Sequence, residues 1–290
     1  MRNVFIIVGI LWCLAGQCQF LDLARVEYTL VPGDHSNFDY SRRRVLFNFP
    51  FRIHDEAYFF AGVDYSNIKL SFTEDIDSFD KDETDDFSLL DLNFTYTFQM
   101  NEDWRFAAQV SPGISSNLES GLEWNDLVFS SVVVFIKDKK MDKDVKKPFR
   151  IIIGAAFSGN GGVPFPIPFV SFYKKFHPKW SYNIGAPISN FQYHASEKVR
   201  LKLFATLDGF NANLQNSQQL SSGELANRIR LNMVLLGSRF EYKLSDHVES
   251  FLTVTRSVNP SIQLRQNRDR LLTLRSGDVM HYRLGVRFKI

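Results

Sequence analysis

Strict alternation between apolar and polar residues is the feature that most limits how this chain can fold. Across residues 91–100 an apolar or aromatic residue occupies every even position, and Asp, Asn, Thr or Gln occupies every odd position. A β-strand points successive side chains to opposite faces, so this period of two predicts a strand with one oily face and one polar face. A helix with the same sequence would mix the two kinds of residue around its circumference.

The same alternation recurs along the chain. Residues 281–290 repeat it without an error, so we expect the chain to end inside a strand. Weaker versions cover residues 44–53, 149–157 and 199–207. A sheet with one face in water would produce the same pattern, so alternation alone does not select a membrane. If the oily face does meet lipid, Arg should be tolerated at Thr95 but not at Phe94 or Tyr96.

Short and long polar breaks separate these segments. The short breaks fall at 54–56, 101–103, 177–179, 196–198 and 245–247. The long ones fall at 32–41, 73–86, 112–125, 158–165, 208–227 and 258–277. Outer-membrane barrels show this asymmetry, with short turns on the periplasmic side and longer loops outside. We therefore predict an all-β fold, a closed antiparallel transmembrane β-barrel.

The number of strands depends on where these breaks lie. A single-chain bacterial barrel needs an even number of strands if both of its ends are periplasmic. Reading residues 180–194 as one strand gives thirteen, whereas a hairpin at Gly185, Ala186 and Pro187 gives fourteen. Twelve strands are the alternative, because the two strands around Pro187 are short. Residues 137–147 depart from the scheme, since this long charged stretch falls where a short turn is expected.

Composition and charge narrow the class of protein further. The 290 residues include 28 Phe and 10 Tyr, as expected when many short strands present aromatic side chains to lipid. Lys and Arg number 34 against 32 Asp and Glu, which gives a formal net charge of +2. A chain this close to neutral lacks the excess positive charge of a nucleic-acid-binding protein, so we expect no nucleic-acid partner.

The first eighteen residues carry the features of an export signal. Arg2 supplies a positive start, residues 4–15 are apolar, and short side chains follow at Gly16 and Cys18. The apolar run is too short to cross a bilayer as a helix. Cleavage after Cys18 would remove a signal peptide at 1–18 and leave one barrel domain at 19–290.

Loss of this signal would remove both cysteines, Cys13 and Cys18. The mature chain would then have no disulfide, no thiolate metal site and no cysteine nucleophile. The alternative is lipidation of Cys18, since residues 14–16 resemble a lipobox, although Gln17 separates them from the cysteine.

Charged residues on the polar faces are the nearest clue to function. If those faces point inward, the cations that line the lumen are Arg200, Lys202, Arg228, Arg230, Arg239, Arg283, Arg287 and Lys289. Asp64, Asp91 and Glu241 are among the few acidic residues expected beside them. A positively lined pore would favour anions. Pairing of the same cations with carboxylates would instead close the interior, and the sequence leaves both possibilities open.

We predict no catalytic residue, no metal site and no cofactor. The 6 histidines are scattered, and a serine hydrolase would need one of them beside a serine and an orienting polar group. The acidic segment 74–86 is interpreted as a solvated outer loop. Binding of a divalent cation there, between neighbouring lipopolysaccharide molecules, is the alternative.

Three short motifs connect the chain to a known family. They are Asn48, Phe49 and Pro50 after a basic strand, the hairpin Gly185, Ala186 and Pro187, and the C-terminal segment 282–290. On these residues the chain resembles an uncharacterised family of Gram-negative outer-membrane β-barrel proteins, domain of unknown function 6268. Such barrels usually end in an aromatic residue, whereas this sequence has Ile290 last and Phe288 two positions before it.

The resemblance implies a place in the bacterial outer membrane, reached by export. The partners that it implies are outer-membrane lipid, lipopolysaccharide and, through the C-terminal strand, the barrel assembly machinery. The family has no established activity. We expect a passive channel for small or hydrophobic solutes, not an enzyme. The alternatives are a structural or interaction barrel with a filled lumen and, third, an outer-membrane lipid hydrolase.

Overall fold

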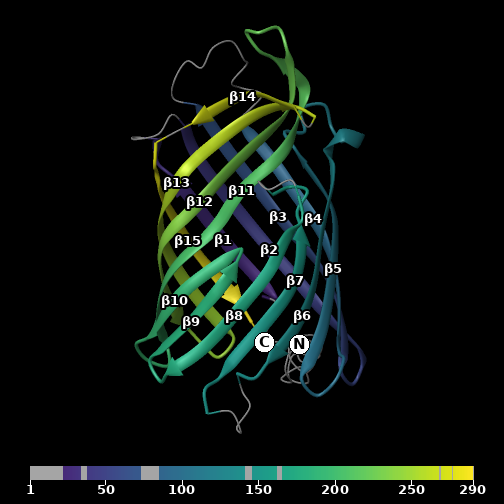
Figure 1. The fold of residues 1–290 in the computed structure, drawn as a ribbon. Helices are drawn as coiled ribbons and strands as arrows, with labels where there is room; N and C mark the ends of the chain where they lie inside the picture. The colour runs from purple at the N-terminus through teal and green to yellow at the C-terminus, as the bar shows by residue number, and fades with distance from the viewer. Residues whose placement is uncertain are drawn as a thin grey trace, which may run out of the picture.

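The structure, a computed structural model, describes residues 22–33, 38–72, 85–140, 146–161, 165–267, 269–275 and 277–289. The predicted signal peptide and most of the acidic segment 74–86 lie outside the described residues. The described chain is almost entirely β-structure wound into one tall barrel (Figure 1). One short 3₁₀ helix, η3 (Trp124–Asp126), precedes the sixth strand. Within the described ranges, no helix has the length and apolar character needed to cross a membrane.

Fifteen strands follow one another along the described ranges. They are β1 (Ala24–Val31), β2 (Phe38–His54), β3 (Ala57–Phe72), β4 (Asp86–Gln99), β5 (Trp104–Ser116), β6 (Leu127–Asp138), β7 (Phe149–Phe157), β8 (Ile167–His177), β9 (Trp180–Ala186), β10 (Ile188–His194), β11 (Val199–Gln219), β12 (Leu225–Lys243), β13 (Val248–Gln266), β14 (Asp269–Arg275) and β15 (Met280–Phe288).

Fourteen of these strands form a closed ring. β1 pairs with β15, from Ala24 opposite Phe288 to Leu30 opposite Tyr282. β13 pairs with β12 on one side and with β15 on the other, while β14 only folds back onto β13. The prediction of a closed antiparallel barrel of fourteen strands is therefore confirmed. The hairpin that makes the count even is present between β9 and β10.

The two ends of the barrel differ, and we call them the turn end and the loop end. Five short turns join β2 to β3, β4 to β5, β8 to β9, β10 to β11 and β12 to β13 at the turn end. β1 begins and β15 ends at this same end, since Ala24 pairs with Phe288. The short polar breaks seen in the sequence therefore lie together on one rim, as the barrel prediction requires.

The apolar side chains of the strands are exposed and the polar ones are buried, which is the opposite of the arrangement in a soluble sheet. On β4, Phe94 is 37% exposed and Tyr96 is 40% exposed, whereas Thr95 between them is 7% exposed. On β2, Phe47 and Phe49 are likewise exposed. An outer band of exposed apolar side chains of this extent needs lipid around it rather than water. The barrel is therefore built to span a membrane.

Several segments that the sequence analysis expected to be loops are strands. Residues 112–116, 208–219 and 258–266 extend β5, β11 and β13, residues 38–41 and 225–227 begin β2 and β12, and residues 269–275 form β14. Their polar residues bond to other parts of the protein instead of to water. For example, Asn213 Nδ2 donates to Asp126 Oδ1 at 2.8 Å, and Gln215 Nε2 donates to Asp126 Oδ2 at 2.7 Å. Runs of Asn and Gln suggest an exposed loop, but they can also form a strand where other parts of the protein cover both of its faces.

Buried apolar side chains fill the loop half of the barrel, and we call them the loop-end cluster. Its members are Val31, Phe38, Tyr40, Ile68, Leu70, Phe72, Phe87, Leu89, Phe210, Ala212, Leu214, Leu220, Ala226, Ile229, Leu231, Met233, Leu235, Ile262, Leu264 and Val279. Phe210 of β11 lies 6.4 Å from the Tyr40 ring of β2 and 5.3 Å from the Phe87 ring of β4, between centroids. These strands are not neighbours in the ring, so the cluster crosses the lumen.

β11 reaches the lumen by bending inward at Gly209. The φ angle there is +147°, and a Cβ atom at this position would lie 2.0 Å from the Leu231 carbonyl oxygen, so only glycine fits. Beyond the bend, Asn213 forms a parallel ladder pair with Ser116 of β5, and the Ser115 hydroxyl donates to the Asn211 carbonyl at 2.7 Å. The end of β11 therefore contacts β5 across the barrel while it stays paired with β12.

The charged stretch 137–147 begins in β6 and continues past the turn-end rim. Lys137 and Lys139 pair with Asp103, in the turn between β4 and β5, at 2.7 and 3.1 Å. The hydrogen bond from the Lys137 ammonium, together with that from Lys139, holds the pKa of Asp103 below its usual range. Residues 141–145 lie outside the described residues. The described part of the stretch therefore binds to the neighbouring turn.

Phe94→Arg should lower the free energy of unfolding by roughly 2 to 4 kcal/mol in lipid vesicles, because it puts a charge on the lipid face of β4. Urea unfolding, followed by heat-modifiable gel migration, measures the change. Phe94→Leu keeps an apolar side chain there and is the control; equal losses would contradict the lipid-facing assignment. Arg at Thr95, which the sequence analysis expects to be tolerated, should also lower stability, because it removes the hydrogen bond that the buried Thr95 hydroxyl donates to Gln109 Oε1 at 3.0 Å.

Candidate functional site in the barrel lumen

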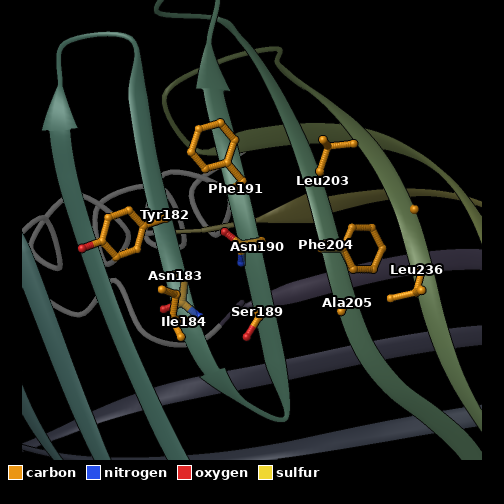
Figure 2. Close-up of a pocket in the computed structure, with 11 residues that line it drawn as sticks. Tyr182, Asn183, Ile184, Ser189, Asn190, Phe191, Leu203, Phe204, Ala205 and Leu236 are labelled. Atoms are coloured by element: carbon orange, nitrogen blue, oxygen red, sulfur yellow. The ribbon is translucent and has the colours of Figure 1, made fainter.

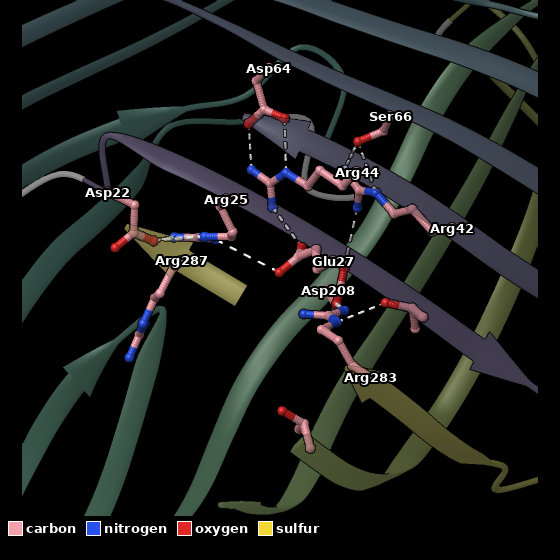
Figure 3. Close-up of polar contacts among 12 residues, drawn as sticks. Asp22, Arg25, Glu27, Arg42, Arg44, Asp64, Ser66, Asp208, Arg283 and Arg287 are labelled. Carbon is pink, nitrogen blue, oxygen red and sulfur yellow. Dashed lines mark hydrogen bonds and ion pairs between the residues drawn. The ribbon is translucent and has the colours of Figure 1, made fainter. Parts of the chain in front are cut away.

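Charged side chains from β1, β2 and β3 form the first part of a band across the lumen (Figure 3). Arg44 Nη2 lies 2.5 Å from Asp64 Oδ2, and Arg44 Nη1 lies 3.4 Å from Glu27 Oε1. The residues next in sequence to Arg44 and Asp64 include the exposed Val45 and Val63. Strand alternation therefore places these charges inside, where pairing offsets the loss of water around them.

Asp208 joins the bend of β11 to two other strands. Its Oδ2 lies 2.6 Å from Arg283 Nη2 on β15, and its Oδ1 lies 3.9 Å from Arg42 Nη1 on β2 (Figure 3). Asp208 Oδ1 also accepts a hydrogen bond of 2.8 Å from the Gly209 N–H. One carboxylate thus holds the bend in place from three directions.

Glu241 is the centre of the second part of the band, nearer the turn end. It is 1% exposed, and its ion-pair partners are Arg200, Lys202 at 2.7 Å and Arg287 at 2.9 Å. Glu249 beside it pairs with Arg200 at 3.2 Å, Lys289 at 3.1 Å and Arg287. Four cations against two carboxylates leave this group with an excess of two positive charges.

A cavity of about 400 Å³ lies between the Glu241 group and the loop-end cluster. Its charged lining includes Arg25, Arg44, Lys202, Asp208, Arg283 and Arg287. Its apolar lining consists of Ile188, Phe204, Leu207, Leu235 and Phe251. The space can therefore accommodate a small molecule that has both a polar and an apolar part.

Arg239 is a cation of this cavity with no ion pair among the described residues. Its guanidinium carbon lies 5.4 Å from the Phe204 ring centroid and 4.8 Å from the Phe251 ring centroid, within cation–π range. Its Nε donates to Thr253 Oγ1 at 2.9 Å. His281 also lines the cavity, and its buried Nε2 has no hydrogen-bond partner in the described structure. Both groups have bonding capacity left for a ligand.

The structure brings six of the eight cations expected in the lumen into this region. Lys202, Arg239, Arg283 and Arg287 line the cavity, and Arg200 and Lys289 belong to the Glu241 group. That they line an open passage stays a prediction. The acidic partners Asp64 and Glu241 lie in the band. Asp91 instead accepts a hydrogen bond from Asn160.

Arg228 and Arg230 are not brought together with the others. Arg228 Nη2 donates to the Asn125 carbonyl at 3.3 Å, and Arg230 Nε donates to Asn211 Oδ1 at 3.4 Å. Both occupy even positions of β12, like the exposed Val234 and Leu236, whereas Arg239 occupies an odd one. An odd spacing within one strand puts two side chains on opposite faces.

Sequence reasoning missed the residues of β1 that enter the band. Arg25 and Glu27 lie at odd positions of β1, whereas the exposed Val26 and Tyr28 lie at even positions. The alternation alone could have assigned them to the lumen. Asp208 was beyond the reach of that signal, because it stands in a segment expected to be a loop.

One serine and one histidine meet in the described structure. Ser181 Oγ lies 2.8 Å from His194 Nε2. Ser181 is fully buried, and the described residues offer no hydrogen-bond partner to orient the other ring nitrogen of His194. A serine nucleophile needs both access to its substrate and an oriented base. Among the described residues there is also no cluster of His, Cys, Asp and Glu suited to a metal ion.

A groove of about 610 Å³ follows the outer face of β9, β10, β11 and β12 (Figure 2). The exposed apolar side chains along it are Ile184, Phe191, Leu203 and Leu236. Asn190 and Phe204 line both this groove and the luminal cavity. The wall of the barrel at this place is therefore a single layer with a binding space on each side.

A family model described as domain of unknown function (DUF6268) matches residues 60–270. No curated protein matches the chain. Among solved structures, the chain is similar to the COG4313 outer membrane channel from Pseudomonas putida F1, with 11% identity and a TM-score of 0.48, over 94% of this chain and 98% of that one.

Two further structures share the barrel outline. The NanC porin has 11% identity and a TM-score of 0.40, over 92% of this chain and 100% of that one. LpxR from Salmonella typhimurium has 8% identity and a TM-score of 0.41, over 92% of this chain and 100% of that one. Similarity at this level carries no information on solute or reaction.

Glu241→Gln should lower the free energy of unfolding by roughly 3 to 5 kcal/mol, because three cations lose a shared, buried carboxylate charge. Glu102→Gln, in the exposed turn between β4 and β5, is the control and should change stability by less than about 0.5 kcal/mol. Urea titration of both variants in lipid vesicles measures the difference. Equal stability of the two would mean that water, not Glu241, balances the luminal cations.

Proposed function

The chain belongs to the family described as a domain of unknown function (DUF6268), and we propose that it is a channel for small or hydrophobic solutes in the outer membrane of a Gram-negative bacterium. Two features support the membrane location. The ring of strands closes through β1 and β15, and its outer band is apolar. Export by the predicted signal peptide, and assembly through β15 beside lipid and lipopolysaccharide, belong to this proposal.

The observation that carries the channel function is the cavity of about 400 Å³ in the middle of the lumen. It lies inside a transmembrane wall, it has a polar and an apolar lining, and Arg239 in it has no ion-pair partner among the described residues. A general diffusion pore would hold a continuous column of water. A small chamber next to the filled loop half supports a narrow, selective passage, and Arg239 in the chamber favours anions.

Passage in this proposal requires movement at the loop end. The loop-end cluster fills that half of the lumen, and the bent part of β11 carries Phe210, Ala212 and Leu214 into it. One ladder pair, Asn213 with Ser116, joins this part of β11 to β5, and hydrogen bonds join Gln215 to Asn117 and Asp126. β11 is the element that we propose as the gate, because its Phe210, Ala212 and Leu214 enter the lumen, and opening would require these bonds to break.

A structural barrel with a filled lumen is the second candidate. The observation in its favour is the pairing of most luminal charges, with Glu241 alone contacting three cations. This candidate needs no passage and predicts a rigid, silent barrel. The two candidates therefore differ in whether the folded protein moves solutes.

Single-channel recording in planar bilayers tests the proposed function. We expect small current steps that prefer anions, and Arg239→Glu should reduce the anion-to-cation permeability ratio severalfold, because it reverses the charge in the cavity. Arg52→Glu, at an exposed position near the turn end, is the control and should leave the ratio unchanged. A heat-modifiable, folded barrel that neither conducts nor admits solutes to vesicles would overturn the channel in favour of the filled barrel.

Phe210→Ala should raise the fraction of time for which the channel is open, because it removes the ring that packs against Tyr40 and Phe87 across the lumen. It should also cost about 3 to 5 kcal/mol of stability. Phe47→Ala makes the same change on the lipid face and is the matched control. An open fraction that responds equally to both substitutions, or to neither, would remove β11 as the gate.

A further inference from the structure

Among the described residues, the barrel wall lacks strand pairing above the short hairpin of β9 and β10. Ile188 is the first residue of β10, and it pairs with Thr206 of β11. The next wall-side bond of β11 in the described structure is from the Asn211 N–H to the Asn160 carbonyl, at 2.8 Å. The intervening stretch spans about 16 Å at the usual rise of a strand. No neighbouring strand pairs with that side of it among the described residues.

Local side chains bind two of the backbone groups along this stretch. The Gly209 N–H donates to the Asp208 carboxylate at 2.8 Å, and the Thr206 hydroxyl donates to the Leu207 carbonyl at 3.2 Å. Such substitutes are needed where a strand edge stands at membrane depth, because lipid offers no hydrogen bonds. These two hydrogen bonds therefore stabilise part of the edge.

The luminal cavity reaches this edge from inside. Ile188 and Leu207 both line the cavity, and each is 45% exposed. The groove reaches it from outside, with Ile184, Leu203 and Leu236 along the membrane face (Figure 2). Asn190 and Phe204 border both spaces and pair with each other, so only a single layer of wall separates the cavity from the groove beside the tip of the hairpin.

The chemistry of the two spaces is complementary to one kind of molecule. The groove is apolar and faces lipid, so it suits a hydrocarbon chain. The cavity holds the guanidinium of Arg239, whose planar N–H groups suit a carboxylate. The other cations that line the cavity pair with acidic residues, so Arg239 offers a guanidinium that a carboxylate can bind without breaking an ion pair.

We infer that this barrel has a side port that binds a fatty carboxylate. The carboxylate lies in the cavity at Arg239, and the chain passes over the tip of the β9–β10 hairpin into the groove on the membrane face. The inference rests on the proposed channel function and names its solute class and its lateral route between the lumen and the lipid.

Photolabelling locates the chain. The probe is a dodecanoate with a diazirine at its last carbon, added to the folded full-length barrel in lipid nanodiscs. We expect mass spectrometry to find labels on the groove peptides that contain Ile184, Leu203 and Leu236, with at least a tenfold loss of label when excess dodecanoate is present. Label spread evenly over the outer band and insensitive to dodecanoate would overturn the port.

Binding measurements locate the carboxylate and the passage. Calorimetry in nanodiscs should show at least tenfold weaker dodecanoate binding for Arg239→Gln, unchanged dodecanol binding, and recovery of dodecanoate binding in Arg239→Lys. Ile188→Trp should weaken both ligands at least tenfold, because it fills the port. Leu284→Trp, on the lipid face of β15, is the matched control. Dodecanoate binding that survives both Arg239→Gln and Ile188→Trp would overturn the inference.

Two further measurements address a failure of Ile188→Trp to fold and the choice between a carboxylate and a phosphate. Ile188→Phe replaces Ile188→Trp if the larger side chain prevents folding, which gel migration shows. Dodecyl phosphate should bind more weakly than dodecanoate, and tighter binding would overturn the carboxylate assignment. If bilayer currents respond to Arg239→Glu but no groove label forms, the port fails and the channel stands. If the groove is labelled but nothing conducts or crosses, the channel fails and the site stands.

Discussion

The need to pair every backbone N–H and C=O group without help from water governs this structure. In lipid an unpaired group costs several kcal/mol, so a sheet at membrane depth must close on itself. β1 and β15 provide the closure, since Ala24 near one end of the described chain pairs with Phe288 near the other. Once the ring is closed, the oily faces turn to lipid and the polar faces turn inward, which reverses the usual burial of Phe94 and Thr95.

That reversal moves charge into a confined lumen, where an isolated ion is costly. Most of the luminal charges meet this cost by pairing, as in the Glu241 group and around Asp208. The cations outnumber the carboxylates, however, and Arg239 is stabilised instead by two aromatic rings and the Thr253 hydroxyl. Arg239 can therefore bind an anion without first breaking an ion pair, which the paired arginines cannot do.

The elements that the sequence predicts correctly are those whose structure is determined by residues close together in the chain. The alternation on β4, the turns at one rim and the hairpin before Ile188 are all local, and all appear in the structure. The path of β11 beyond Gly209 depends on contacts with β5 and η3, far away in sequence, so its Asn and Gln residues suggested a loop. Arg228 and Arg230 are a separate case, because the local sequence was enough to assign their face. They lie at an even spacing from Val234, whereas Arg239 lies at an odd spacing from it and therefore on the opposite face.

The filled loop half and the interrupted wall have a common origin in the bend of β11. Beyond Gly209, β11 stays paired with β12, carries side chains into the lumen, and has no strand neighbour on its other side next to the hairpin among the described residues. The inward path brings Phe210 against Tyr40, and the missing neighbour exposes Leu207 beside the short hairpin. Asp208 stabilises both, because its carboxylate binds Arg283 and also pairs with the Gly209 N–H that a neighbouring strand would otherwise bind. Any movement of β11 that empties the loop half must therefore also change the edge at the hairpin.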